Sequence, residues 1–126
     1  MWATYNYDNL PTVLVTLNGI IKSDDEFREF ITEWIRLFNL GEDFTFVFDT
    51  VKCGLINVKY AIQMAYWIKR FKKRGYKNLK SSKIIVANHS IIYLLRLIFF
   101  IERPIAPVKI VFEKSNGVIV EETFQP

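Results

Sequence analysis

Short apolar runs alternate along this chain with longer stretches in which apolar residues recur every three or four positions. The runs Thr12–Leu17, Phe44–Phe48 and Lys83–Ala87 have the length and the β-branched or aromatic content of strands. The stretches between them have the spacing of amphipathic helices. Strands that alternate with helices favour a sheet with parallel pairs and helices packed on it. This one feature therefore predicts an α/β fold.

Three helices are expected, and each has recognisable end signals. Ser23 and Glu26 stand three residues apart before the first helix, in the form of a capping box. Asn88-His89-Ser90 can cap the third helix. The helices are expected from after Ser23 to Gly41, over Asn57–Arg74 up to Gly75, and over Ile91–Glu102 up to Pro104 and Pro107.

Further strands are expected near both ends of the chain, at Trp2–Tyr7, Val108–Phe112 and Val118–Phe124, the last two joined by a turn at Ser115-Asn116-Gly117. A length of 126 residues is that of one ordinary domain, with enough chain to bury a core. We therefore expect a single α/β domain over residues 1–126. Its mixed central sheet would have five or six strands with three helices, in the order β-β-α-β-α-β-α-β-β.

Cysteine content and hydropathy indicate where such a chain resides. Cys53 is the one cysteine, so an internal disulfide is impossible and a reducing compartment is the simpler interpretation. The first residues lack the basic start and apolar run of a signal peptide. Ile91–Ile101, the longest apolar stretch, is interrupted by Arg96 and is too short to cross a bilayer. The sequence predicts a soluble, intracellular, cytoplasmic protein.

The net charge of +4 conceals a strong asymmetry along the chain. Between Thr50 and Ile101 there are 11 Lys and Arg residues and no Asp or Glu. A charge distribution of this kind can steer an anionic partner, or pair with the acidic remainder of a second copy. Most of these cations form a basic cluster, which comprises Lys69, Arg70, Lys72, Lys73, Arg74, Lys77, Lys80 and Lys83.

The basic cluster has three interpretations. It is a solvated helix end and loop, where cations favour a helix C-terminus, or a nucleic-acid surface, for which Tyr76 is the one candidate stacking residue. The third is a surface for an anionic membrane. Such a cluster is more often a solvated helix end and loop than a binding site.

The middle of the chain resembles STAS domains, the sulfate transporter and anti-sigma factor antagonist family. In that family an apolar strand ends in Asp, and a Ser-containing turn then opens a helix that ends in a basic stretch and Gly. Phe46–Asp49, Asn57–Tyr60 and the segment Lys69–Gly75 follow this pattern at the same spacing. The resemblance implies a regulatory, non-catalytic domain that binds other proteins. Val58 stands at the place of the family's phosphorylatable Ser, so a phosphorylation switch there is not expected.

A second, weaker resemblance is to the CRAL-TRIO lipid-binding domains, which share the same general fold. Lys83–Ser90, the apolar helix Ile91–Ile101, Pro104 and Val108–Phe112 look like the late strand-helix-strand segment of that family. In that family this helix gates a lipid cavity. The resemblance implies binding of a lipid or another apolar ligand, and it requires a cavity under the third helix.

Two helices carry more apolar residues than one contact with a sheet requires. On the second helix Val58, Ala61, Ile62, Ala65 and Ile68 form one stripe, and Tyr60, Met64, Trp67 and Phe71 form another. The second stripe either packs on a neighbouring element or, together with Asn57, forms a surface for a protein partner or a second copy. On the third helix we expect either complete burial or a ligand gate, with Tyr93, Leu97 and Phe100 as the gate residues.

A catalytic interpretation has little support in the residues. Asp49, Cys53 and His89 are the one conceivable set of orienter, nucleophile and base, and each lies near a strand end. With one His and one Cys, a zinc site is not expected, and no cofactor is expected either. The sequence therefore favours a non-catalytic interaction or regulatory module. Its partner would be a protein or a second copy, and the rivals are an apolar ligand, a nucleic acid and an anionic surface.

Overall fold

A computed structural model describes the chain except for residues 115 and 116, and gives only the backbone for 113, 114 and 117–121. In the described part, nine elements follow in the order that the sequence predicts. They are β1 (Ala3–Asn9), β2 (Thr12–Leu17), α1 (Asp24–Leu40), β3 (Phe44–Asp49), α2 (Val58–Lys73), β4 (Leu79–Val86), α3 (His89–Ile101), β5 (Val108–Lys114) and β6 (Gly117–Phe124).

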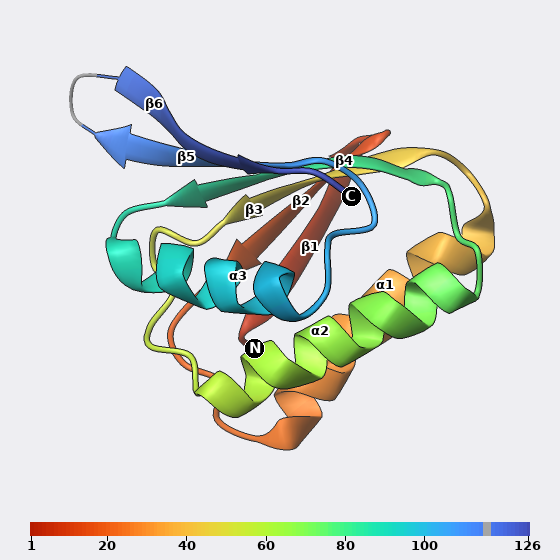
Figure 1. Ribbon diagram of the computed structural model, residues 1–126, viewed down its shortest axis with the longest axis horizontal. Coiled ribbons are helices and arrows are strands. Elements are labelled where there is room, and N and C mark those ends of the chain that lie inside the picture. The colour runs from red at the N-terminus through yellow and green to blue at the C-terminus, as the bar shows by residue number, and fades with distance from the viewer. Residues whose placement is uncertain (115–116) are drawn as a thin grey trace.

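The six strands form one mixed sheet in which their spatial order is their order in the sequence. Strands β2 to β5 are parallel, and β1 and β6 pair antiparallel at the two edges. Parallel connections are right-handed, and each one here moves a strand in the same direction across the sheet. All three helices therefore lie on one face, as Figure 1 shows.

The predicted centre of the fold is confirmed. Phe44–Asp49 and Leu79–Val86 are neighbouring parallel strands, and the segment between them contains the long helix Val58–Lys73. β4 begins four residues earlier than predicted. Its first half is polar (Leu-Lys-Ser-Ser), so the strand is fixed there by its parallel pairing with β3 and not by its composition. The predicted turn at 115–117 falls largely on residues outside the described part.

The predicted capping box before α1 does not form, because the expected hydrogen bonds of Ser23 and Glu26 are replaced by others. Ser23 is the residue that caps the helix, but its side chain makes no capping hydrogen bond. The Glu26 carboxylate instead accepts hydrogen bonds from the backbone N–H groups of Lys22, at 2.7 Å, and Trp2, at 3.1 Å. The carboxylate reaches the backbone N–H of Trp2 because the buried Trp2 lies beside this end of the helix. Gly41 ends α1 as predicted, with φ of 76°.

Large aromatic side chains fill the space between the sheet and the first two helices. The ring of Trp34 on α1 lies 4.7 Å from Phe46 of β3 and 6.1 Å from Phe71 of α2. Phe38 adds a second contact with Phe71 at 4.9 Å. These centroid distances are those of favourable aromatic pairs. The aromatic layer therefore fixes the distance of α2 from the sheet.

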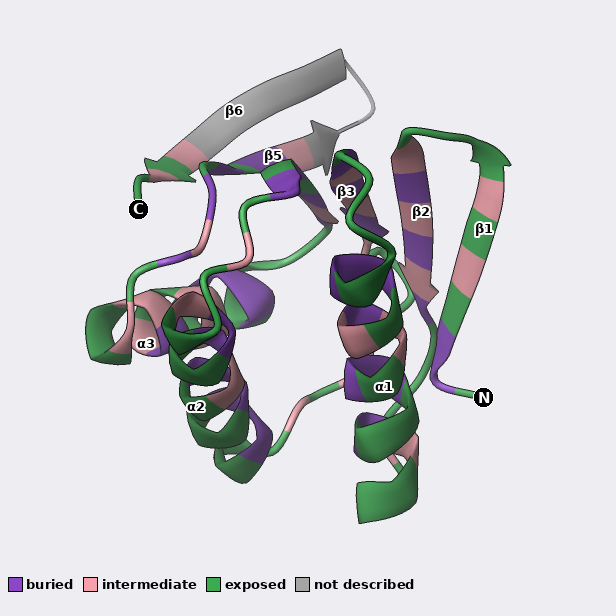
Figure 2. Ribbon diagram, turned by 90° about the vertical axis from the view of Figure 1, so that its right-hand side faces the viewer, coloured by how far each residue is buried: buried purple, intermediate pink, exposed green. Residues whose placement is uncertain are grey.

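The opposite face of the sheet carries no helix, as Figure 2 shows. Side chains alternate between the two faces along a strand, so Val13 and Val15 are fully buried under the helices while Leu14 and Thr16 are partly exposed. Parallel sheets are normally covered on both faces. The exposed face here is therefore unusual, and it is tolerated because Thr, Ser and Lys are interspersed with its apolar residues, as at Thr45 and Lys83.

Asn78, just before β4, joins this strand to the end of α1. The residue is buried, and its side-chain amide donates hydrogen bonds to the carbonyl oxygens of Leu37, at 3.1 Å, and Glu42, at 3.1 Å. Its own carbonyl accepts from the N–H of Phe44 at 2.8 Å. The last carbonyls of a helix have no partner within the helix. Asn78 therefore supplies the donors that allow the end of α1 to be buried.

Replacing Asn78 with Ala should lower the free energy of unfolding by about 1–3 kcal/mol, since buried carbonyl groups lose their donor. Urea unfolding followed by tryptophan fluorescence measures this. The matched control is Gln63→Ala, at an exposed position of α2, which should change stability by no more than about 0.5 kcal/mol. Equal effects of the two substitutions would contradict this role of Asn78.

Candidate functional site

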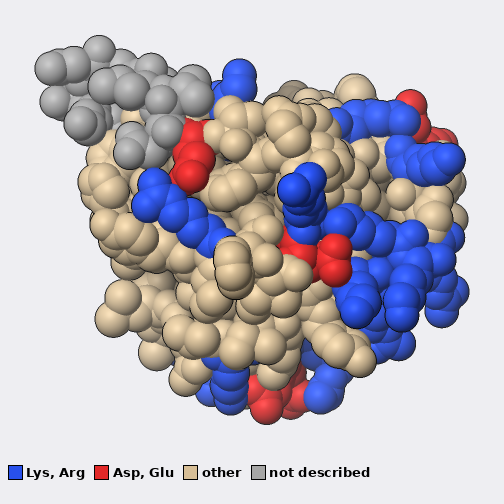
Figure 3. Space-filling model, in the orientation of Figure 1, with Lys and Arg blue, Asp and Glu red and all other residues tan. Residues whose placement is uncertain are grey.

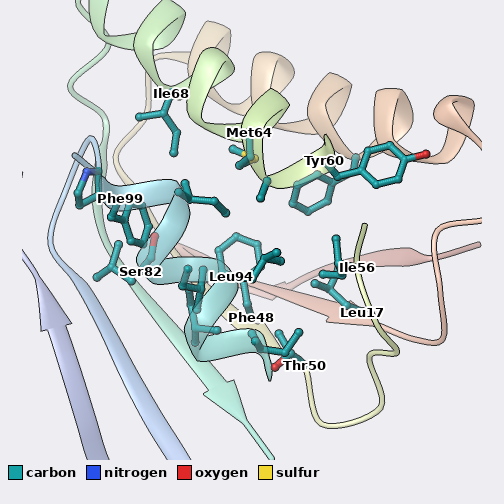
Figure 4. Close-up of a pocket in the computed structure, with 18 of the residues that line it drawn as sticks. Leu17, Phe48, Thr50, Ile56, Tyr60, Met64, Ile68, Ser82, Leu94 and Phe99 are labelled. Atoms are coloured by element: carbon teal, nitrogen blue, oxygen red, sulfur yellow. The ribbon is translucent and has the colours of Figure 1, made fainter. Parts of the chain in front are cut away.

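A partly open cavity of about 130 Å³ lies between the sheet and the layer of helices, with residues of α1, α2 and α3 in its lining. Figure 4 shows residues from the sheet and from the helices pointing into it. Its walls are almost entirely apolar. The lining residues are Trp2, Leu17, Ile21, Phe27, Phe30, Trp34, Phe48, Thr50, Ile56, Tyr60, Ala61, Met64, Ile68, Leu79, Ser82, Ile84, Ile91, Leu94, Leu95, Ile98, Phe99, Pro104, Ile105, Ala106 and Val108.

The space exists because small residues meet where α3 crosses the sheet. α3 packs mainly against α2 and contacts the sheet little. Beneath it, β4 and the segment before β5 contribute Ser82 and Ala106, and α2 contributes Ala61, each of them buried. The aromatic layer under α1 and α2 borders the cavity on one side, where Trp34 and Phe48 belong to its lining. Small side chains leave a void when large aromatic residues nearby hold the facing helix away from the sheet.

α3 forms the outer wall of the cavity. Leu94, Leu95 and Phe99 line it and are also partly exposed, so this wall is one side chain thick. The Phe99 ring is 4.8 Å from Phe124 of β6, which anchors the C-terminal part of the helix. At the other end, Asn88 caps α3 as predicted, because its side chain accepts a hydrogen bond from the N–H of Ser90 at 3.0 Å.

The few polar groups along the cavity differ in their hydrogen bonds. Thr50 donates its hydroxyl hydrogen to the carbonyl of Ile85 at 2.7 Å. The hydroxyl of Tyr60 donates to Asp24 at 2.8 Å, and this bond raises the pKa of Tyr60. The Ser82 hydroxyl makes no hydrogen bond with any described residue. Among the described residues, no Lys, Arg, Asp, Glu or His lines the cavity, so it suits an uncharged ligand.

The indole N–H groups of Trp2 and Trp34 are buried without a well-formed hydrogen bond. Each lies near a protein group all the same. Trp34 favours the ionised form of Tyr5, although burial raises the pKa of that hydroxyl overall. Trp2 favours the ionised form of Cys53. Burial nevertheless raises the pKa of the Cys53 thiol overall. Both residues line the cavity, and neither indole N–H has a hydrogen-bond partner among the described residues.

The predicted partner surface on α2 is placed differently by the structure. Tyr60, Met64 and Phe71 are buried, Trp67 is partly buried, and Asn57 is exposed but caps the helix by accepting from the N–H of Lys59. That stripe therefore faces the core. In the first stripe Ala61, Ala65 and Ile68 are buried as well, and only Val58 and Ile62 are more than half exposed. Tyr66, which belongs to neither stripe, is 67% exposed beside them. Helix periodicity identified the apolar residues of α2, but it could not show which of them α3 and α1 would cover.

The predicted gate residues of α3 do not line the cavity. Tyr93 and Phe100 point to solvent, with Phe100 89% exposed, and Leu97 is partly buried outside the lining. Three residues that do form the wall, Leu94, Ile98 and Phe99, stand one position away on the helix. The error is one of helix rotation, since an almost wholly apolar helix gives no periodic signal for the buried side.

The basic cluster covers the C-terminal end of α2 and the loop after it, on the right of Figure 3. Lys72 pairs with Glu102 at 2.7 Å and Lys80 with Asp43 at 3.7 Å. Arg70 lies over the ring of Trp67, at 4.7 Å. Lys69, Lys73, Arg74 and Lys77 are exposed and form no ion pair within the described part of the chain. Lys83 is on the open face of the sheet, apart from them.

Tyr76 does not serve this cluster as a stacking platform. Its ring is partly buried against Phe38, with centroids 4.8 Å apart, and its hydroxyl donates to Asn39. A base could not stack on this ring face without displacing Phe38. The cluster is thus a group of cations without the aromatic residue that the nucleic-acid interpretation required.

Asp49, Cys53 and His89 are not joined by any contact in the described part of the chain. The Asp49 carboxylate accepts from the N–H of Val51, Cys53 is free and buried, and the His89 ring packs on Phe112 at 5.3 Å. Burial raises the pKa of the Cys53 thiol, which disfavours the nucleophilic thiolate. The described residues also hold no group of three or more potential metal ligands. They form no helix long and apolar enough to cross a membrane.

Comparisons with protein-family models, with curated proteins and with solved structures gave no significant match to this chain. The resemblances to STAS and CRAL-TRIO domains therefore stay predictions. The cavity under α3 is the candidate site that the geometry itself supplies.

Proposed function

We propose that this domain binds an apolar ligand in the cavity beneath α3. The observation that carries the proposal is a partly open cavity of about 130 Å³ whose walls are formed by apolar side chains of the sheet and of all three helices. Most binding sites for small molecules are concave and largely apolar, and lie between packed elements. The CRAL-TRIO resemblance required a cavity at this place, under the third helix.

The cost of keeping such a space supports a role for it. An unfilled cavity destabilises a protein by about 24 cal/mol per Å³, which for this volume is about 3 kcal/mol. That is a large part of the net stability of a small domain, which is about 5–15 kcal/mol. Larger residues at Ser82 or Ala106 would remove the space. A ligand that fills it recovers the lost packing energy.

The volume sets the size of the ligand part that enters. An apolar cavity of about 150 Å³ in another protein holds benzene, so the cavity here accommodates one ring or a few carbon atoms of an alkyl chain. A longer lipid requires α3 to move outward. The thin wall formed by Leu94, Leu95 and Phe99 is where this movement would open the cavity.

Benzene should bind the purified domain and raise its free energy of unfolding, by about 2.7 kcal/mol at 100 times the dissociation constant. Ala61→Leu places a larger side chain at the cavity wall and should abolish this effect. Ala106→Leu provides a second filling variant if the first folds poorly. Differential scanning calorimetry with and without benzene measures the shift.

The matched control is Ile62→Leu, which changes the next residue of α2 on its exposed side and should leave benzene binding unchanged. If benzene does not stabilise the wild-type domain, or stabilises the filled variants equally well, apolar ligand binding in this cavity is excluded. If benzene does bind, native mass spectrometry of freshly purified protein identifies any natural ligand that co-purifies.

A second candidate function is protein binding, as the STAS resemblance implies. The specific observation is the exposed stripe Val58, Ile62 and Tyr66, in which each side chain is more than half exposed along one face of α2. Exposed apolar patches mark interaction sites in soluble proteins. The cations at the end of the same helix would orient an acidic partner or the acidic part of a second copy.

Replacing both Ile62 and Tyr66 with Ser should weaken association at least tenfold without unfolding the domain, because both side chains face solvent. Size-exclusion chromatography with light scattering measures self-association over a concentration series. Gln63→Ser, beside them on the helix, is the control. A wild-type chain that is monomeric at all concentrations argues against the second copy as the partner.

A further inference from the structure

The floor of the cavity contains a polar residue at a position that its neighbours occupy with apolar side chains. In the sheet register Ser82 of β4 lies between Phe46 of β3 and Val108 of β5. The next inward-facing residue of the same strand is Ile84. An aliphatic residue at position 82 would complete the row and remove space from the cavity. Ser82 both enlarges the cavity and places a hydroxyl group in it.

The residue that carries this hydroxyl is buried, and no described residue pairs with it. Ser82 is 7% exposed, and its side chain makes no hydrogen bond with any described residue. Figure 4 shows it on β4, among the residues that line the cavity. A hydroxyl that loses its water partners in an apolar site is unfavourable unless another group replaces them. Thr50 and Tyr60, the other hydroxyl residues along the cavity, have protein partners.

The surroundings determine what can satisfy it. No Lys, Arg or His among the described lining residues could neutralise a carboxylate or a phosphate, and an unpaired charge in such a place is prohibitively costly. The complementary group is therefore neutral. A hydroxyl or carbonyl oxygen fits, since the Ser hydroxyl both donates and accepts.

We propose that Ser82 is the hydrogen-bonding residue of the cavity, and that its ligand is an uncharged, mainly apolar molecule with one hydroxyl or carbonyl group placed against it. This inference rests on the proposed apolar-ligand function and adds the ligand class. Alcohols, phenols, ketones and esters belong to this class. Fatty acids in their ionised form and phosphorylated head groups do not enter the cavity at this point.

Benzene and phenol provide a matched pair of probes, because they differ by one hydroxyl group. Phenol must give up hydrogen bonds to water in order to enter the cavity, and Ser82 can replace one of them. We expect wild-type protein to bind phenol at least as tightly as benzene. Ser82→Ala should weaken phenol binding about tenfold and leave benzene binding unchanged or stronger. Isothermal titration calorimetry or NMR titration at fixed salt measures both constants.

The outcomes separate this inference from the function on which it rests. If Ser82→Ala alters the binding of the two probes equally, or leaves phenol binding intact, the role of Ser82 is overturned while the cavity remains a binding site. If neither probe binds the wild-type domain, the proposed function and this inference are both overturned. Ser82→Leu should abolish binding of both probes by occupying the cavity. Ser82→Ala should also unfold at a denaturant concentration no lower than wild type, because it removes an unpaired hydroxyl.

Discussion

The handedness of the strand connections determines most of this structure. Four parallel strands follow one another across the sheet in sequence order, and each right-handed connection returns over the same face. Sheets of this kind have no point at which the strand order reverses, where α/β proteins usually form a ligand crevice at the carboxyl ends of the strands. The internal space must therefore lie between the sheet and its single helical layer, which is where the cavity is found.

The size and chemistry of that space follow from how two helices are supported. Aromatic residues such as Trp34 and Phe71 hold α2 away from the sheet. Next to it, residues of α3 line the cavity together with the small residues Ser82 and Ala106. The void is thus a product of neighbouring packing distances and not of any single residue. Its apolar walls exclude charge, and the hydroxyl of Ser82, which pairs with no described residue, gives the cavity a hydrogen-bonding group.

Much of the fold could be predicted from the sequence because the signals were local. Asn57, Asn88 and Gly41 mark helix ends through the conformation and hydrogen bonds of their own backbone, and all three have those roles in the structure. β4 was predicted too short because its polar first half is a strand only through pairing with β3. Glu26 binds the backbone near the chain terminus, a contact that its position in the sequence could not reveal.

The candidate site shows the boundary between the two kinds of information. By itself the sequence determined the order of helices and strands, the apolar character of α2 and α3, and the concentration of cations after Trp67, because these depend on residue type and spacing. Only the tertiary structure decided which side of each helix is buried. Tyr60, Met64 and Phe71 face inward, while Val58, Ile62 and Phe100 remain in solvent. A helix that is apolar on most of its circumference takes its rotation from the elements that pack against it, and a cavity is set by distances between residues far apart in the chain.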